Sequence, residues 1–128
     1  MKSLCLIDTD IVIDFLRGNA HAISLLKKCS ASACFSCITV AEIYAGVESG
    51  EEEKDVVRLF SMFQVYPITE KIAKTAGLMV KKFGKSHSVE IPDALIAATC
   101  TVYNLSLLTL NVKHYPMIKN LDSPYRKS

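Results

Sequence analysis

Three carboxylates and one amide stand where a predicted strand ends or a predicted helix begins: Asp8, Glu42, Asp93 and Asn111. Ligands of open parallel sheets bind outside the carboxyl ends of the strands, so these side chains are expected near one another. Converging carboxylates without a cationic partner repel one another, and a divalent cation would relieve that repulsion. Oxygen ligands without Cys or His among them favour Mg²⁺ or Mn²⁺ over zinc. The pattern therefore indicates metal-assisted hydrolysis of a phosphate ester.

The elements that must position these side chains alternate between strand and helix. Apolar runs without helical periodicity predict buried strands at residues 3–7, 33–38, 64–67 and 105–110. Helical patterns predict helices at residues 11–17, 20–29, 39–47, 55–63, 69–83 and 92–103, with polar breaks at 49–53 and 84–88. The alternation predicts an α/β fold in which one parallel sheet of four to five strands lies between helices, in three layers.

Local signals support two of the helix starts. Thr9 or Asp10 is the expected N-cap of the first helix. Pro92 suits the first turn of the last helix, because its missing N–H would have no helical partner there. Asp93 then lies at the positive end of the helix dipole, where a carboxylate is stabilised.

Length and composition predict a single domain spanning residues 1–128, with a polar tail from about residue 119. Half of the residues are hydrophobic, so a folded core is expected, and a net charge of +2 permits RNA as a partner without arguing for it. Acids interrupt the first apolar run too early for a secretory signal, and residues 91–110 are too polar for a membrane span. We therefore expect a cytoplasmic protein with no membrane partner.

Five cysteines in a chain without a secretory signal argue against a disulfide framework. The Cys34-x-x-Cys37 pair could be half of a zinc site or a redox pair. No second CxxC or HxxxH accompanies it, so we predict buried structural thiols.

Each candidate residue also has a purely structural interpretation. Thr39-x-x-Glu42 matches a capping box, in which Glu42 would only bond back to the start of its own helix. Asp93 could be a first-turn acid favoured by the helix dipole, and Asp10 reads more readily as a cap than as a ligand. The remaining charged residues are expected at the surface: an Asp14–Arg17 pair, three scattered histidines (His21, His87 and His114) and a solvated lysine face.

Four stretches together resemble the PIN-domain family and, within it, the VapC-type toxins of bacterial and archaeal toxin–antitoxin pairs. These stretches are Leu6-Ile-Asp-Thr-Asp10, Thr39-Val-Ala-Glu42-Ile-Tyr-Ala-Gly46, Ile91-Pro-Asp93-Ala-Leu-Ile-Ala-Ala-Thr99 and Leu108-Thr-Leu-Asn111-Val-Lys-His-Tyr115. The resemblance spans nearly the whole chain and implies an endoribonuclease in which Asp8, Glu42 and Asp93 hold Mg²⁺ or Mn²⁺. It also implies a homodimer and a cognate antitoxin that lays an extended segment over the acidic groove.

The chain departs from the family pattern at three positions. Asn111 is a neutral amide where an acid is frequent, which removes one charge from the site. His114 also stands where an acid is frequent, whereas Asp10 adds a carboxylate where Asn or Ser is commoner. These departures leave open whether one metal ion or two would bind.

The sequence therefore predicts a metal-dependent ribonuclease with Asp8, Glu42 and Asp93 as catalytic metal ligands, and with Asn111 as a further candidate. Thr109 and Asp10 are expected to support the ligands from behind, and four lysines are candidate contacts to RNA phosphates: Lys81, Lys82, Lys85 and Lys113. One alternative is a non-catalytic PIN-like module that binds RNA or protein. A second is a haloacid-dehalogenase-like phosphatase with Asp8 as nucleophile, although the later acidic motif of that family is missing.

Overall fold

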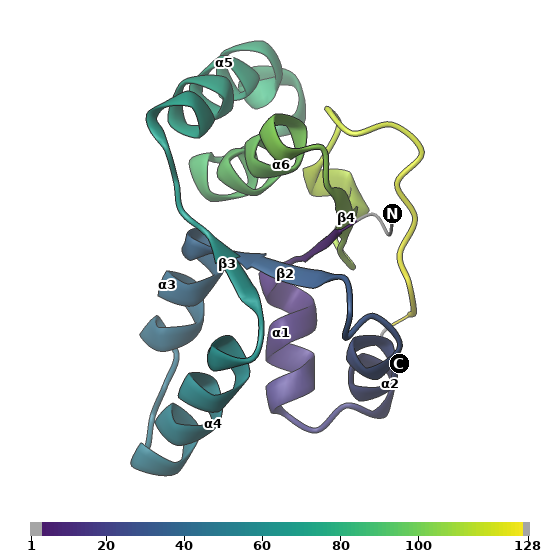
Figure 1. Cartoon of the computed structure of the whole chain (residues 1–128). Helices are drawn as coiled ribbons and strands as arrows, with labels where there is room; N and C mark the ends of the chain where they lie inside the picture. Colours follow the sequence, from purple (N-terminus) through teal and green to yellow (C-terminus); the bar gives the residue numbers. More distant parts are fainter. Residues whose placement is uncertain (1–3, 127–128) are drawn as a thin grey trace.

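Four parallel strands form one sheet in the computed structural model, which describes residues 4–126 (Figure 1). In chain order the strands are β1 (Cys5–Ile7), β2 (Ala33–Ser36), β3 (Gln64–Tyr66) and β4 (Ser106–Leu108). Their order across the sheet is β3-β2-β1-β4, and every pair is parallel. The carboxyl ends of all four strands therefore meet at one edge, as the sequence predicts.

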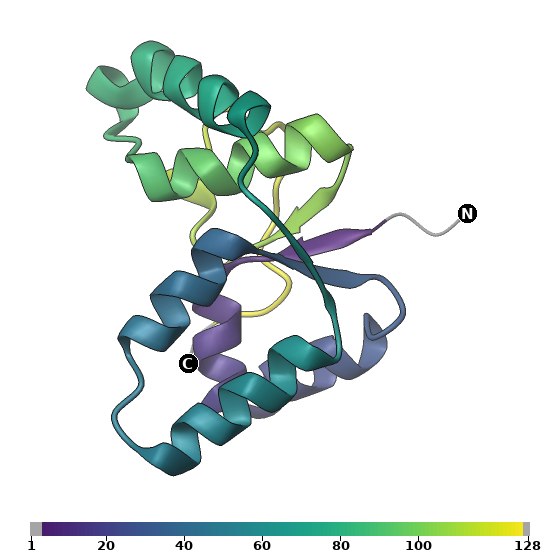
Figure 2. The same cartoon turned by 60° about the vertical axis from the view of Figure 1, so that its left-hand side comes forward.

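Helices cover both faces of this sheet. Those of the described residues are α1 (Thr9–Leu16), α2 (Ala20–Lys28), α3 (Cys37–Ala45), α4 (Gly50–Ser61), α5 (Glu70–His87), α6 (Ile91–Tyr103) and the short 3₁₀ helix η1 (Val112–His114). Figure 1 and Figure 2 show α5 and α6 on one face and α1, α2 and α4 on the other, which gives the three predicted layers. None of the helices in the described range is long and apolar enough to cross a membrane.

Neighbouring strand residues enter two different cores, because side chains alternate across a strand. Leu6 and Cys34 belong to the core that α6 completes, whereas Ile7 and Phe35 belong to the core formed with α1, α2, α3 and α4. All four side chains are fully buried. Burial on both faces explains why the two central strands, β1 and β2, read as continuous apolar runs without alternation.

The first helix begins two residues earlier than predicted, at Thr9 rather than Ile11. Asp8, rather than Thr9 or Asp10, is the N-cap of α1, and its side chain accepts a hydrogen bond from the Thr9 backbone N–H. Strand β1 ends at Ile7, so the cap residue is also the first residue beyond the strand. This direct passage from strand to helix places the Asp8 carboxylate at the carboxyl edge of the sheet.

Two predicted breaks are helical instead. Ser49 caps α4, and the acids at 51–53 form its first turn, where the helix dipole favours negative charge. The prediction of a polar break at 49–53 was wrong because an acidic run is compatible with a helix start. Helix α5 continues through Gly84 to His87 and ends where Ser88 adopts a left-handed conformation, so the predicted loop at 84–88 was also wrong.

The C-terminal segment runs from the α6 layer past β4 to the α1–α2 side of the molecule (Figure 1). There the Tyr125 hydroxyl donates a 2.8 Å hydrogen bond to Asp14 Oδ2, and the Tyr125 ring stacks on His21. Burial, followed by the bond to Asp14, raises the pKa of Tyr125. Asp14 is only 5% exposed, so the predicted surface pair with Arg17 was wrong.

Candidate active site

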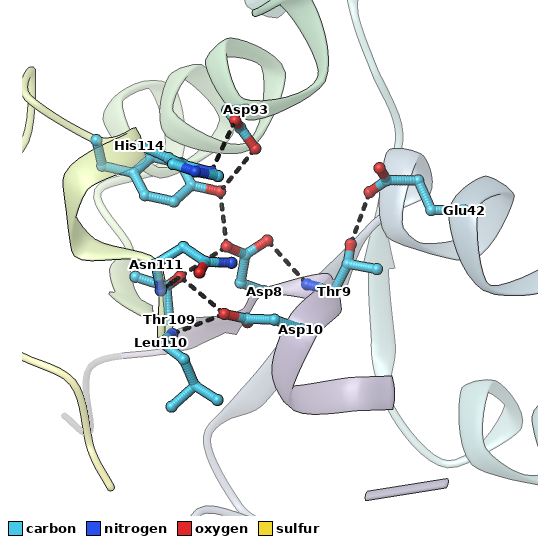
Figure 3. A network of polar contacts seen from close by, with 10 residues as sticks. Asp8, Thr9, Asp10, Glu42, Asp93, Thr109, Leu110, Asn111 and His114 are labelled. Atoms are coloured by element: carbon cyan, nitrogen blue, oxygen red, sulfur yellow. Dashed lines mark hydrogen bonds and ion pairs between the residues drawn. The ribbon is translucent and has the colours of Figure 1, made fainter. Parts of the chain in front are cut away.

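Asp8 is held by three donors at the edge of the sheet (Figure 3). Its Oδ1 accepts from the Thr9 N–H at 2.8 Å, and its Oδ2 accepts from the hydroxyls of Thr109 at 2.8 Å and Tyr115 at 2.7 Å. Asp8 is buried, with only 6% of its surface exposed. Burying a carboxylate is costly unless hydrogen bonds replace its water, and these donors supply that replacement.

Asp93 faces Asp8 from the start of α6. Its helix begins at Ile91 with Pro92 in the first turn, and no side chain caps it. Asp93 Oδ2 lies 3.3 Å from His114 Nδ1, and Asp93 Oδ1 lies 3.5 Å from the Tyr115 hydroxyl (Figure 3). Burial raises the pKa of Asp93, the His114 ring counters this, and the charge of Asp8 adds to the rise. Asp93 is therefore a carboxylate that the fold only partly compensates.

Glu42, the third acid of the site, lies on α3. Its Oε1 accepts a 2.7 Å hydrogen bond from the Thr9 hydroxyl (Figure 3). That hydroxyl lies 3.0 Å from the hydroxyl of Thr39. A hydroxyl carries one proton, so Thr39 donates to Thr9 while Thr9 donates to Glu42. Helix α3 begins at Cys37 with Ser36 as its cap, so the capping-box interpretation of Thr39 and Glu42 was wrong.

Thr109 and Asp10 connect β4 to α1 behind these acids. Besides bonding Asp8, the Thr109 hydroxyl accepts from the Asn111 N–H at 3.0 Å. Asp10 accepts from the Ile11 N–H and from the Leu110 N–H, both at 2.8 Å. Both Asp10 oxygens thus contact backbone donors. The Asn111 side chain is exposed at this end of the sheet.

The site concentrates negative charge. No lysine or arginine in residues 4–126 forms an ion pair with Asp8, Glu42 or Asp93. All three offer carboxylate oxygens, the donors that Mg²⁺ and Mn²⁺ prefer, so the donor chemistry fits such an ion. Within the described part of the chain, however, no three acidic, His or Cys side chains are arranged to hold one ion together. The Glu42 carboxylate is instead bonded to the Thr9 hydroxyl.

Comparison with known proteins identifies the family to which this arrangement belongs. Residues 5–117 match the family model described as the PIN domain. The chain belongs to the PIN-domain family. Ribonuclease VapC10 of Mycobacterium tuberculosis is 38% identical over 125 residues, covering 95% of this chain and 93% of that protein. Ribonuclease VapC19 of the same species is 37% identical over 125 residues, covering 94% and 98%.

A solved structure agrees with these relatives. One chain of a toxin–antitoxin complex from Klebsiella pneumoniae matches with a TM-score of 0.83 and 28% identity, over 96% of this chain and 99% of that chain. The predicted resemblance to VapC-type PIN proteins is confirmed. Membership in the PIN-domain family also rules out the alternative of a haloacid-dehalogenase-like phosphatase.

Two PIN-site contacts were missed by the sequence prediction. His114 was expected as a surface or loop histidine, yet its exposed ring faces Asp93. No role was predicted for Tyr115 beyond its place in the last matching stretch, yet it is 1% exposed and its hydroxyl donates to Asp8. The available signal was their position in the turn directly after Asn111, at the end of the last strand.

The four candidate RNA-contact lysines stand at the exposed surface of the PIN domain. Three of them, here called the C-terminal lysines of α5, are Lys81, Lys82 and Lys85. Lys82 Nζ lies 5.2 Å from the centre of the Phe83 ring. The fourth, Lys113, lies in η1 between Asn111 and His114. Their role toward RNA stays a prediction.

All five cysteines of the PIN domain lie in the described range, and each is a free thiol. Cys34 is buried in β2, and burial raises its pKa to about 12. Cys37, by contrast, is exposed at the first position of α3, so the prediction of a buried thiol was wrong there. The strand ends one residue before Cys37, which turns that side chain out of the sheet.

Proposed function

We propose that this chain is an endoribonuclease that hydrolyses RNA phosphodiester bonds with Mg²⁺ or Mn²⁺, and that it is the toxin of a VapBC-type pair. Its relatives support the activity, because they are named ribonucleases. The observation that carries the proposal is the pairing of Asp8 and Asp93 at the carboxyl edge of the sheet, where no described lysine or arginine neutralises them. A bound cation would relieve the repulsion between these two carboxylates.

Asp8 and Asp93 would be the principal ligands of that ion, and Glu42 would complete the set directly or through water. When bound, the ion would supply charge stabilisation at phosphorus and a more acidic water. Hydrolysis joins the water oxygen to phosphorus, breaks one P–O ester bond and protonates the leaving oxygen. Glu42 is exposed and carries one hydrogen bond from Thr9, so its carboxylate is available to accept the proton of the attacking water.

Neighbouring residues would hold the ligands and the RNA. Thr109 fixes the orientation of Asp8 through its 2.8 Å hydrogen bond, and Asp10 ties the start of α1 to the end of β4. Asn111 would bind water or a ligand oxygen through its exposed amide. Lys113 and the C-terminal lysines of α5 would contact phosphates, which position RNA without reading its sequence.

A hollow of about 480 Å³ beside Glu42 suits the antitoxin. It lies between α1, α3 and α4, with apolar side chains such as Ile13 and Val56 and acids such as Glu48 and Glu52. A partner segment with apolar and basic residues would match this lining. The solved relative from Klebsiella pneumoniae is a toxin–antitoxin complex, which supports such a partner. A homodimer is also proposed, on family resemblance alone, and light scattering of the purified chain would test it.

Cleavage of total cellular RNA by the purified chain tests the activity. Parallel reactions would contain Mg²⁺, Mn²⁺ or EDTA, and two variants would accompany the wild type. Asp93→Asn removes a proposed ligand, whereas Asp55→Asn changes an exposed aspartate that pairs with Arg58 on α4. Both variants must show a cooperative unfolding transition.

Discrete cuts that need the metal, persist in Asp55→Asn and vanish in Asp93→Asn would support the proposal. Cutting that persists in Asp93→Asn would refute the assignment of the site. No cutting by the wild type, together with crosslinking to RNA, would favour the non-catalytic binding module instead.

A further inference from the structure

Tyr115 places one hydroxyl between the two carboxylates that face each other across the site. The hydroxyl donates to Asp8 Oδ2 at 2.7 Å, and Asp93 Oδ1 lies 3.5 Å away on its other side. Tyr115 is 1% exposed, so water is kept from its bond with Asp8, whereas the Asp93 side chain is 31% exposed and reaches solvent. A phenol has one proton, and the shorter distance assigns that proton to the bond with Asp8.

The chain around Tyr115 fixes where this hydroxyl lies. Tyr115 ends η1, and its N–H donates to the Val112 carbonyl at 3.1 Å, while the His114 N–H donates to the Asn111 carbonyl at 2.9 Å. His114 contacts Asp93 Oδ2, the oxygen that Tyr115 does not face. Two consecutive residues of one turn therefore meet both oxygens of Asp93.

The Tyr115 ring and the Tyr115 hydroxyl have separable roles. The ring belongs to the core that Leu6, Ile96 and Leu107 form between the sheet and α6, so phenylalanine would fill the same space. The hydroxyl adds nothing to that apolar packing, because its contacts are the two carboxylates. A polar group buried at this position is therefore explained by the site rather than by the core.

We propose that Tyr115 is a positioning residue, whose hydroxyl holds Asp8 and Asp93 at the separation and orientation that a divalent ion requires. This inference rests on the proposed function, since it concerns the proposed ligands. Without the hydroxyl, Asp8 Oδ2 keeps one of its two donors, the hydroxyl of Thr109. The two carboxylates then lose the group between them and move apart by repulsion. The ion would then have to bring the two carboxylates back together, and this free-energy cost would weaken its binding, as loss of an outer hydrogen-bond partner generally does.

A second tyrosine of this chain offers a matched control. Tyr125 donates to Asp14 Oδ2 at 2.8 Å, nearly the distance between Tyr115 and Asp8, and within the described residues its hydroxyl forms no hydrogen bond with Asp8, Glu42 or Asp93. Tyr115→Phe and Tyr125→Phe each remove one phenolic hydroxyl from one aspartate. Both variants lose stability, but only the first changes the proposed metal site.

The test measures Mn²⁺ binding to the full chain, by calorimetry and by the paramagnetic resonance signal of free Mn²⁺, without RNA. We expect Tyr115→Phe to weaken the affinity by about 10-fold or more, and Tyr125→Phe to stay within about twofold of wild type. In parallel, Mg²⁺ is titrated into wild type with ¹³C at the tyrosine ζ carbons. The resonance of Tyr115 should shift while that of Tyr125 stays, a readout that does not depend on how well either variant folds.

Affinity of Tyr115→Phe that equals or exceeds the wild-type value would overturn the positioning role, because the hydroxyl would then be neutral or would compete with the ion. An unmoved Tyr115 resonance in metal-saturated wild type would overturn it as well. Wild type that binds no Mn²⁺ would overturn the proposed metal-dependent function and this role together. A selective loss in Tyr115→Phe supports both.

Discussion

Thr109→Val tests whether hydrogen bonds hold the Asp8 carboxylate in place. Valine matches threonine in shape and leaves the packing of this fully buried position unchanged. The hydroxyl it removes donates to Asp8 Oδ2 at 2.8 Å and accepts from the Asn111 N–H at 3.0 Å. The variant therefore removes one charge-assisted bond and leaves one backbone donor without its partner.

The magnitude follows from these two bonds. A hydrogen bond to a charged group is worth about 1.5–3 kcal/mol, and leaving the N–H of Asn111 unpaired adds about 1 kcal/mol, since that residue is exposed and water reaches it. We expect the free energy of unfolding to fall by about 2.5–4 kcal/mol. For a chain of this size, that loss lowers the melting temperature by roughly 7–16 °C. Urea denaturation and thermal melts in EDTA measure both quantities.

Thr99→Val is the matched control. Thr99 is also fully buried, but its hydroxyl donates to the Leu95 carbonyl of its own helix, at 2.7 Å. That carbonyl is in the interior of α6 and keeps its helical bond, so the loss should be about 1 kcal/mol or less. Equal losses in the two variants would refute the reasoning, because Thr109 would then contribute no more than a neutral hydroxyl.

Three further predictions concern charge and the C-terminal segment. Burial, with the charge of Asp8 nearby, raises the pKa of Asp93. Such a group stabilises the fold at acid pH, and this contribution is lost as the pH rises through the raised pKa. Asp93→Asn should therefore raise the melting temperature in EDTA at pH 7, with the gain disappearing below about pH 4; a lower value at pH 7 would contradict it. Changing the three C-terminal lysines of α5 to Gln should reduce the slope of log affinity for RNA against log salt by about 2, at unchanged melting temperature. Tyr125→Phe should cost about 1.5–3 kcal/mol in urea denaturation, because Asp14 is buried and loses a charge-assisted bond.

The layers and the edge that carries the site were predictable from the sequence. The apolar run at 33–38 carries no alternation because its strand, β2, is buried on both faces. Asp8 followed such a run, and Pro92 marked the start of the helix that carries Asp93. These signals are local, and each depends on residues within one turn or one strand. Local signals are the ones that a single sequence carries most clearly.

The contacts inside the site depend on residues far apart in the chain, and the sequence does not show them. Tyr115 meets Asp8 across a separation of 107 residues, and Tyr125 meets Asp14 across 111. The capping-box pattern at Glu42 failed for a related reason. Ser36 had already capped the helix, which left Glu42 free to turn toward Thr9. When a side chain has two possible partners, the tertiary fold decides which of them it contacts.

The two facing carboxylates are compensated to different degrees, and this difference bears on how the site works. Asp8 accepts three hydrogen bonds from the protein, which offset the loss of its water. Asp93 has one partner within 3.3 Å, the ring of His114, and burial, which that ring only partly counters, raises the pKa of Asp93. The fold thus supplies Asp8 as a fixed anchor and leaves at Asp93 the negative charge that an incoming cation would neutralise. A divalent ion should gain most of its binding energy there, so that orienting Asp93 against Asp8 becomes the task of the Asn111–Tyr115 turn.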